Sequence, residues 1–461
     1  MRLRRPSFRR SALVLAAAAA LHGLVYIPLV STNEETDTWS YVASANAILD
    51  GSYTTPLQAG FFFVYPIGWF DITGARIPQR AWQAPERQVF RPPGYPAYLA
   101  LFGESKVFLG EHKGALVGNG VLFGLGAFLL MLTVRRWWDD DVALLAGLLY
   151  ALDPWSKHYV PLALSETLAG TLALAAVYAF TLAWERPGWP RWAAVGALAA
   201  ALALVRAVFV FVAPLAALAA AIRRGTARER VARAAAVALV SAVFLVPWLA
   251  WTNNVVGRTT MSVWGEGYNL ALAASGEGHG TTAADVEADA AFQERMDRVR
   301  AHVPSANEIL RDPTAHPRYL SRADELVRDD ALDQYGQRLR DEPLDVLWDG
   351  VYRMWFLWNA HEDWYQPGGL AELPLRALDW LLIALALVGA RLAVGGGGAA
   401  RGVVFLLAAY TLILGTHHVE ARFAMPLRGV FLALVALALG RMLSDRWRSR
   451  SSSSGPAPTP R

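Results

Sequence analysis

The sequence predicts an all-α, polytopic membrane protein. The 461 residues are 54% hydrophobic, the mean hydropathy is +0.27, and apolar residues gather in long blocks with almost no charge. These blocks are residues 11–30, 114–134, 162–183, 191–222, 231–252, 374–392, 402–416 and 426–443. Several reach the roughly 20 residues that a helix needs to cross a hydrocarbon core of about 30 Å. The block 191–222 is too long for one crossing, so we expect two helices there, broken near Arg206.

The chain begins with a basic segment that leads into an apolar one. Residues 1–10 carry five arginines, and apolar character then continues through His22 and Gly23 to Val30. A signal peptide begins in the same way, and cleavage after the alanines is the alternative. Because the apolar stretch extends so far, we expect an uncleaved first transmembrane helix.

Arginine-rich connections predict how the helices are oriented. They lie at residues 1–10, 135–141, 185–191, 223–233, 390–401 and 441–450. Positively charged loops stay in the cytoplasm. The segments expected on the extracytoplasmic face are therefore 31–92, 154–161, the turn near Arg206, 253–373 and 416–422.

Residues 95–110 decide how many times the chain crosses the membrane. They are only moderately apolar, and Glu104 and Lys106 interrupt them. A full crossing here would move the later arginine-rich loops to the other side. We therefore expect an interfacial or re-entrant helix and ten crossings with both ends inside; eleven crossings is the alternative.

Four regions are expected along the chain. Residues 1–252 form an N-terminal transmembrane module that includes the first extracytoplasmic loop, 31–92. Residues 253–373 form a second extracytoplasmic loop, with polar helices at about 283–301 and 318–341 and an amphipathic helix after them. Residues 374–444 form the C-terminal transmembrane helices, and residues 445–461 form a disordered cytoplasmic tail.

Four aromatic residues in the amphipathic stretch follow helical spacing. They are Trp348, Tyr352, Trp355 and Trp358. Such a stripe indicates an aromatic belt at the membrane interface. It could also form one wall of a groove for a lipid substrate, and the two interpretations are compatible.

Composition excludes some classes of site. The chain has no cysteine, which excludes disulfides, a thiolate nucleophile and a zinc–thiolate site. The formal net charge is +4, but the arginines mark the ends of loops. We therefore do not expect nucleic-acid binding.

Unusual polar side chains fall on one predicted face, at the outer ends of apolar helices. They are Asp37, Arg91, Lys157, His158, Glu166, Arg206, His417, His418, Glu420 and Arg422. Charge at membrane depth is costly, so such groups are candidates for function. Each also has a structural interpretation, since Lys157 or Arg206 could extend to the headgroups. Glu166 is the least explained in this way, because it lies inside an otherwise apolar helix.

Two carboxylates and several cations at a membrane surface suit a phosphate linked to a lipid. Guanidinium groups hold phosphate oxygens bidentately and stay charged when desolvated. A carboxylate can deprotonate an attacking hydroxyl while cations stabilise charge on the departing phosphate. This chemistry describes glycosyl transfer from a polyprenyl phosphate. The candidates are Asp37 and Glu166 for catalysis and, for the donor phosphate, Arg91, Lys157, His158, Arg206 and Arg422.

Ion-coupled transport is the alternative use of paired acids and bases, in a lipid-linked-sugar flippase or a small-solute transporter. Transporters place such charges mid-helix near the bilayer centre and show internal repeats. Here the charges lie at helix ends, and no repeat is visible. A third interpretation is a non-catalytic assembly subunit. A metal site at His417, His418 and Glu420 is not favoured, because adjacent histidines point to different sides of a helix.

Several short motifs occur along the chain in a characteristic order. Asp37-x-x-x-Tyr41 follows the first helix, and "FRPPGYP" (90–96), "LSETL" (164–168) and "HHVEARFAMPL" (417–427) come after it. This order resembles the GT-C superfamily of membrane glycosyltransferases. The branch it resembles is that of protein O-mannosyltransferases and lipid A aminoarabinose transferases (glycosyltransferase family 39-like), and the likeness extends to about residue 443.

The resemblance implies a GT-C fold in a multi-pass cell-membrane protein with an extracytoplasmic site. It also implies an inverting mechanism, a polyprenyl-phosphate sugar donor and a cell-envelope acceptor that is a glycan, a lipid or a protein. Asp37 matches the catalytic aspartate, which acts as base or orients the acceptor, and Glu166 matches a second acid. Arg91 matches a contact to the donor phosphate, with Arg422 near the same cavity. Further candidates from the motifs are Tyr41, Tyr95, His418 and Glu420.

The sequence departs from the family at two places. Protein mannosyltransferases carry an adjacent Asp-Glu pair in the first loop, whereas Thr38 follows Asp37 here. The loop 253–373 also lacks the β-rich inserted domain of the eukaryotic enzymes. The first departure counts against a protein acceptor. Some GT-C enzymes require a divalent metal, and Asp37 and Glu166 could hold Mg²⁺ or Mn²⁺.

Overall fold

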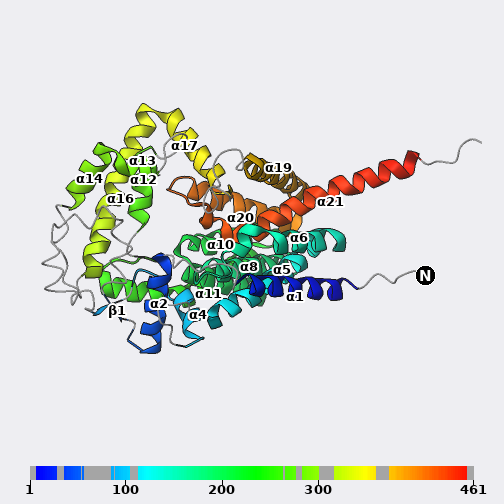
Figure 1. Ribbon diagram of the computed structural model, residues 1–461, viewed down its shortest axis with the longest axis horizontal. Coiled ribbons are helices and arrows are strands. Elements are labelled where there is room, and N and C mark those ends of the chain that lie inside the picture. The colour runs from blue at the N-terminus through cyan, green and yellow to red at the C-terminus, as the bar shows by residue number, and fades with distance from the viewer. Residues whose placement is uncertain are drawn as a thin grey trace, which may run out of the picture.

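The computed structural model describes residues 7–27, 36–52, 54–56, 85–87, 89–103, 113–262, 265–276, 283–300, 316–359 and 373–453. Long helices form an apolar bundle, and shorter polar helices lie beyond one end of it (Figure 1). The N-terminus and the C-terminal end of the last helix lie at the other end of the bundle (Figure 1).

The bundle consists of α1 (Phe8–Tyr26), α5 (Lys113–Trp137), α6 (Asp140–Leu152), α8 (Glu166–Glu185), α9 (Trp189–Val205), α10 (Val212–Ile222), α11 (Ala227–Val256), α19 (Leu373–Gly396), α20 (Gly398–Leu414) and α21 (Arg428–Ser453). Within the described ranges, six helices are long and apolar enough to cross a membrane, and three more apolar helices are shorter. With α6, these account for the ten crossings that the sequence predicts. The prediction of an all-α polytopic membrane fold is confirmed.

Two predicted interruptions of the helices are present. Arg206 ends α9 with an extended backbone (φ −141°, ψ 115°), and the 3₁₀ turn η4 (Ala207–Phe209) leads into α10. The helix α4 (Gly94–Ala100) has only seven residues. At 1.5 Å per residue it is about 10 Å long, too short to cross a bilayer. This favours the interfacial interpretation of residues 95–110, of which 104–110 lie outside the described residues.

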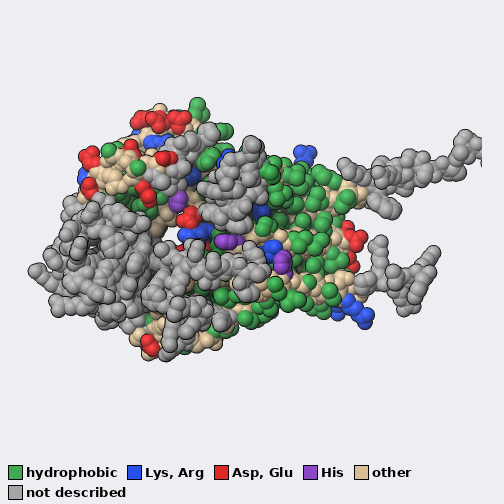
Figure 2. Space-filling model, viewed as in Figure 1, with side chains coloured by type: hydrophobic (Ala, Val, Ile, Leu, Met, Phe, Trp, Pro, Cys, Tyr) green, Lys and Arg blue, Asp and Glu red, His purple; other side chains and the backbone are tan. Residues whose placement is uncertain are grey.

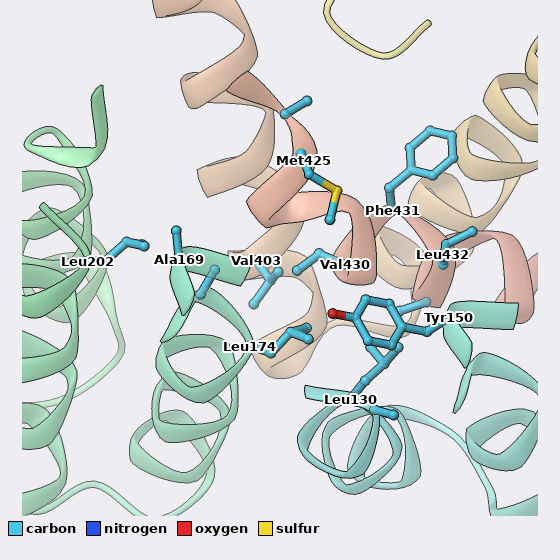
Figure 3. Close-up of a cluster of buried hydrophobic side chains, with 14 of the residues drawn as sticks. Leu130, Tyr150, Ala169, Leu174, Leu202, Val403, Met425, Val430, Phe431 and Leu432 are labelled. Carbon is cyan, nitrogen blue, oxygen red and sulfur yellow. The ribbon is translucent and has the colours of Figure 1, made fainter. Parts of the chain in front are cut away.

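The core of the bundle is built from apolar side chains of several helices. Figure 3 shows Leu130 of α5, Tyr150 of α6 and Leu174 of α8 facing Val403 of α20 and Val430 of α21. Lipid tails are as apolar as these side chains, so close packing stabilises such a core more than removal from water does.

Glycines permit the closest helix crossings. A Cβ on Gly389 of α19 would lie 1.9 Å from the backbone oxygen of Leu434 in α21, and one on Gly196 of α9 would lie 2.5 Å from that of Val237 in α11. No side chain fits at either position. Small residues at helix interfaces are typical of membrane bundles.

Apart from one long helix, α16, the elements outside the bundle are short. They are α2 (Thr36–Leu49), an antiparallel pair of β1 (Thr54–Pro56) and β2 (Pro85–Arg87), α7 (Pro154–His158), α12 (Glu266–Ala274), α13 (Ala283–Ala288), α14 (Ala290–Arg300), α16 (His316–Asp341) and α17 (Pro343–Phe356). The polar helices predicted near 283–301 and 318–341 correspond to α13 with α14 and to α16. At the C-terminus, α21 continues to Ser453, so residues 445–453 of the expected disordered tail are helical.

The predicted aromatic stripe on α17 is only partly present. Trp348 is 56% exposed, but Trp358 is buried. Its ring stacks on Phe431 at 5.4 Å and its Nε1 donates to Oγ1 of Thr411 at 3.2 Å. The reason is that α17 ends at Phe356, so the helical spacing no longer places Trp358 on the same face.

Asp324 of α16 anchors the start of α12. Its fully buried carboxylate accepts hydrogen bonds from the backbone N–H groups of Gly265 (3.1 Å) and Gly267 (3.0 Å), and Nη2 of Arg258 lies 3.4 Å away. Burial raises the pKa of the Asp324 carboxyl to about 6, although Arg258 and the two N–H groups act to lower it. The contact thus joins α12 to α16 through a carboxyl whose pKa is raised to about 6.

Replacing Asp324 with asparagine is expected to remove a pH dependence of this contact. Because the native pKa lies above the ordinary value of 3.8, the native state binds the proton more tightly, and the region loses stability as the pH rises towards about 6. The asparagine carbonyl still accepts from the glycine N–H groups but carries no charge. Hydrogen exchange of α12 amides, corrected for intrinsic rates, should be slower at acidic than at neutral pH in the parent protein and insensitive to pH in Asp324→Asn.

The control for this experiment is Asp329→Asn, an exposed acid on the same helix. It should behave as the parent protein does. Equal protection of α12 at both pH values in the parent protein would contradict the role assigned to Asp324.

Candidate active site

The predicted site lies where the bundle meets the polar helices. Figure 2 shows basic, acidic and histidine side chains around a hollow between the polar helices and the apolar body. The segments that reach this region are the start of α2, the turn before α4, α7 with the start of α8, the α9–α10 break, and the stretch before α21. They are widely separated in the sequence.

Asp37 is held between two arginines. It lies in the first turn of α2, and its Oδ1 accepts from Nη2 of Arg91 at 2.8 Å while its Oδ2 accepts from Nη1 of Arg422 at 3.0 Å. Arg91 precedes α4, and Arg422 lies in the 3₁₀ turn η7 (Ala421–Phe423). The Asp37 side chain is 16% exposed, so it is part of an ion-pair network rather than a solvated loop acid.

The surroundings of Asp37 keep its carboxyl ionised. Burial by itself raises the pKa of this carboxyl, but the guanidinium groups of Arg91, Arg422 and Arg206 outweigh burial and hold the pKa below the ordinary value of 3.8. Opposite charges within a few ångströms favour the charged form. Asp37 is therefore negatively charged at any pH near neutrality.

The second predicted acid, Glu166, pairs with Arg206. Glu166 is the first residue of α8 and only 2% exposed, and its Oε1 accepts from Nη1 of Arg206 at the end of α9. The other oxygen, Oε2, has no hydrogen-bond partner among the residues that the structure describes. Buried polar atoms are nearly always paired. This oxygen is therefore able to accept a hydrogen bond from a ligand.

Two tyrosines of the predicted motifs join α2 to its neighbours. Tyr41 lies one turn beyond Asp37, its hydroxyl is 3.1 Å from Oγ of Ser165, and the Arg91 guanidinium lies 4.8 Å from the centre of its ring. Tyr95 packs edge-on against Tyr41 with ring centres 4.8 Å apart. Both tyrosines are buried, and Tyr41 supports the guanidinium group of Arg91.

The segment before α21 contributes the remaining acid. Glu420 pairs with Arg422, and its Oε1 is 3.9 Å from Nε2 of His418. The backbone N–H of His418 donates to the carbonyl of Asn269 in α12 at 2.8 Å. The segment that carries Arg422 is thus attached to the polar helices.

Lys157 and His158 lie on different sides of α7. Nζ of Lys157 is 3.5 Å from Nε2 of His22 in α1. Burial lowers the pKa of His158, while the charge of Glu166 acts to raise it. Lys157 is directed toward α1, whereas the arginines cluster around Asp37 and Glu166.

One buried ion pair in this region was not predicted. Nη2 of Arg428, at the start of α21, lies 3.2 Å from Oδ1 of Asp153, and both side chains are at most 4% exposed. The guanidinium also lies over the rings of Trp155 (5.1 Å) and Phe431 (4.7 Å). The available signal was Arg428 itself, the first charge inside the apolar block 426–443.

The other oxygen of Asp153 holds α7 in place. Oδ2 accepts from the backbone N–H of Ser156 at 2.8 Å and from its hydroxyl at 2.7 Å. Pro154 follows at the first helical position, which suits proline. Asp153 therefore fixes both the start of α7 and the start of α21.

The donor set around Asp37 does not fit a divalent metal. Within the described part of the chain, no three His, Cys, Asp or Glu side chains form a group that could hold a metal ion. Both oxygens of Asp37 are paired with arginines, and Glu166 is paired with Arg206. The positive charge of the three guanidinium groups would repel a metal cation beside Asp37 and Glu166. The expectation that Asp37 and Glu166 hold Mg²⁺ or Mn²⁺ is not supported by these contacts.

An apolar cavity lies directly below the charged groups. It contains about 620 Å³ of empty space, part of which is open to the surroundings, and α8, α9, α10, α20 and the start of α21 line it. Leu202 of the lining is one turn before Arg206, and Leu427 is five residues after Arg422. Tyr410 is the one polar side chain of this lining, and its hydroxyl donates to the carbonyl of Phe423 at 2.9 Å. The cavity is thus continuous with the segments that carry the arginines.

Comparison with known families gives a match over the centre of the chain. The sequence profile of the dolichyl-phosphate-mannose-protein mannosyltransferases matches residues 91–251, a range that includes Arg91, Glu166 and Arg206. A search of curated protein sequences found no significant match.

Solved structures resemble the whole chain. The archaeal oligosaccharyltransferase AglB from Archaeoglobus fulgidus, in complex with an inhibitory peptide and a dolichol-phosphate, superposes with a TM-score of 0.54 at 14% identity and covers 98% of this chain and 53% of its own. The apo Archaeoglobus fulgidus oligosaccharyltransferase gives 0.52 at 15% identity, with coverages of 97% and 52%. ArnT from Cupriavidus metallidurans bound to undecaprenyl phosphate gives only 0.37 at 14% identity, with coverages of 93% and 77%.

The chain spans about half the length of the oligosaccharyltransferases that it matches. At such low identity the likeness establishes the fold, and the profile match adds the family relationship for residues 91–251. The fold and the profile match both agree with the resemblance that the order of motifs indicated. The chain thus shares the fold of these oligosaccharyltransferases, and its residues 91–251 are similar to the mannosyltransferase family.

Proposed function

We propose that the protein transfers a sugar from a polyprenyl-phosphate-linked donor to a cell-envelope acceptor at the extracytoplasmic face. The observation that carries the proposal is the convergence of Asp37, Arg91 and Arg422 at one end of an apolar bundle. The mannosyltransferase profile and the dolichol-phosphate held by the archaeal oligosaccharyltransferase support a lipid-phosphate donor.

The proposed reaction is a single displacement at the anomeric carbon. A hydroxyl of the acceptor attacks this carbon from the face opposite the phosphate, and its proton passes to Asp37. The bond between the anomeric carbon and the phosphate oxygen breaks, and its electron pair leaves with the polyprenyl phosphate. The configuration at the anomeric carbon is therefore inverted. The low pKa of Asp37 keeps it ready to accept a proton, which it does late, once the attacking hydroxyl has become acidic.

The arginines are suited to join the base to the leaving group. Each guanidinium has five N–H donors in a planar fork, and the contact with Asp37 uses only part of this capacity. Arg91 and Arg422 can therefore hold Asp37 and bind phosphate oxygens at the same time. Stabilising charge on the departing phosphate in a partly buried site is a large contribution to such catalysis.

The apolar cavity suits the isoprenoid chain of the donor. Its lining is almost wholly hydrocarbon, and Leu202 of this lining lies one turn before Arg206. An isoprenoid bound there would place its phosphate next to Arg206 and Arg422. The cavity and the arginines together support a donor that has an apolar chain and a phosphate.

The distribution of arginines supports an extracytoplasmic site. Arg9 and Arg10 in the first turn of α1, and the basic residues 441–450 of α21, lie at the end of the bundle away from the polar helices (Figure 1). Arg135 and Arg136, in the last turn of α5, follow the same rule. Because positively charged segments stay in the cytoplasm, the opposite end of the bundle faces outwards.

The test is transfer by the purified protein in liposomes, with a panel of polyprenyl-phosphate hexoses and pentoses and a cell-envelope extract as acceptor. Release of free polyprenyl phosphate is the measurement. Ala199 lines the cavity and is fully buried, so Ala199→Phe should fill the space. We expect the KM for long-chain donors to rise about tenfold, which corresponds to about 1.4 kcal/mol, with little change for short-chain donors.

The control variant is Leu387→Phe, at a position of α19 that is 68% exposed on the bundle surface. It should leave both KM values unchanged. Equal effects of Ala199→Phe on long and short donors would contradict the role of the cavity. Movement of the donor across the bilayer without cleavage would instead support the flippase.

A further inference from the structure

The helix α17 has the reverse of the arrangement expected in water. Four of its exposed side chains are large and apolar: Leu344 (77%), Leu347 (63%), Trp348 (56%) and Val351 (40%). Their spacing of three and four residues places them on one face. The opposite face is buried and carries two charged residues, Asp349 and Arg353, which are 8% and 2% exposed.

Ion pairs and hydrogen bonds hold this orientation. Asp349 accepts from Nη2 of Arg338 at 3.0 Å. Arg353 donates from Nε to the carbonyl of Gly415 at 2.9 Å and from Nη2 to the hydroxyl of Tyr335 at 2.8 Å. Turning the apolar face inward would leave these buried charges without partners, which is strongly destabilising. The apolar face is therefore held outward.

The apolar face of α17 continues into the lipid-facing surface of the bundle. The rings of Trp355 in α17 and Trp380 in α19 lie 5.1 Å apart. Next to them on α19, Leu378 (47%), Trp380 (57%) and Leu381 (55%) are exposed. α19 contains a membrane-span candidate, and α17 runs obliquely toward its outer end and that of α20 (Figure 1). Tryptophan is enriched where membrane proteins pass the headgroups.

We propose that the apolar face of α17, formed by Leu344, Leu347, Trp348 and Val351, contacts lipids of the leaflet next to the site. The end of α17 nearest the bundle lies deepest, and its first turn lies toward the headgroups. Through Arg353 and Gly415, the helix then fixes the level of the segment that carries Arg422. The site is held at headgroup depth, where the phosphate of any membrane lipid lies. This lipid contact does not depend on the proposed transfer reaction.

The absence of cysteine in the chain permits a direct test. Single-cysteine variants Leu347→Cys, Trp348→Cys and Val351→Cys, each carrying a nitroxide, are reconstituted in phosphatidylcholine vesicles. Power-saturation EPR then compares collisions with oxygen, which concentrates in lipid, and with a water-soluble nickel chelate. We expect oxygen to dominate at all three positions, most strongly at Val351, as it should at the reference position Leu387→Cys of α19.

The matched controls are exposed leucines on the neighbouring polar helix. Leu332→Cys and Leu339→Cys of α16 start from side chains that are 54% and 53% exposed, and the nickel chelate should dominate there. Nickel dominance on α17 as well would overturn the proposal. Low collision rates with both reagents would also overturn it, because a second copy or another protein would then cover the face. Unchanged thermal unfolding of each labelled variant shows that it is folded.

Discussion

Replacing Asp37 with asparagine is expected to abolish sugar transfer and leave the protein folded in the membrane. Asparagine has nearly the same shape and can still accept a hydrogen bond from Arg91 or Arg422, but it cannot take a proton from an acceptor hydroxyl. Loss of a positioned base reduces the rate by about 10²–10⁴-fold. The initial rate of polyprenyl phosphate release measures the effect.

The same substitution should leave donor binding intact or tighten it. Removing the negative charge frees Arg91 and Arg422 to bind the phosphate, so kcat falls while the donor Kd does not rise. A merely structural role of Asp37 would weaken both. Asp50→Asn is the matched control, because Asp50 follows the end of the same helix and is exposed. A near-parental rate in Asp37→Asn would refute the mechanism.

The second large effect is expected at the buried pair of Asp153 and Arg428. Removing one partner leaves a charge buried without compensation, which destabilises a protein by about 3–5 kcal/mol. We expect Arg428→Met to lower the thermal unfolding midpoint in detergent markedly. The double variant Asp153→Asn with Arg428→Met should recover much of this loss, since no charge is then buried alone and the asparagine oxygen can still accept from Ser156.

The exposed pair of Arg135 and Asp140 provides the comparison. Its side chains are 43% and 51% exposed, so Asp140→Ala should change stability by less than about 1 kcal/mol. If Arg428→Met is no more harmful than Asp140→Ala, the pair does not hold α21 against α7. Because Asp153 also caps α7, its loss should disturb the region around Lys157 and His158 as well.

The sequence could indicate which charged residues to propose for the site, but not which acid pairs with which arginine. Carboxylates and guanidinium groups at the ends of apolar helices are conspicuous in a sequence, because membrane depth otherwise excludes them. Asp37, Glu166 and Arg206 were found in this way. Nothing in the sequence indicated that Asp37 pairs with Arg91 and Arg422 while Glu166 pairs with Arg206, since the partners are contributed by different segments.

The sequence left a divalent metal open for the same reason. Two acids on one face are compatible with Mg²⁺ when their neighbours are unknown. Once guanidinium groups occupy both oxygens of Asp37, the site already has its counter-charges. The buried pair of Asp153 and Arg428 was overlooked because an aspartate before a proline and an arginine at a helix start are ordinary features by themselves.

The sequence alone determined the membrane helices, the break at Arg206 and the GT-C resemblance, and it supplied the residues that we propose for the site. It could do so because crossing a bilayer requires a continuous run of apolar residues, and every exception to that run is visible. Only the tertiary structure decided which charges meet, which face of α17 is exposed, and where the apolar cavity lies. These depend on contacts between residues far apart in the chain, and the helical period of one segment carries no information about its neighbours.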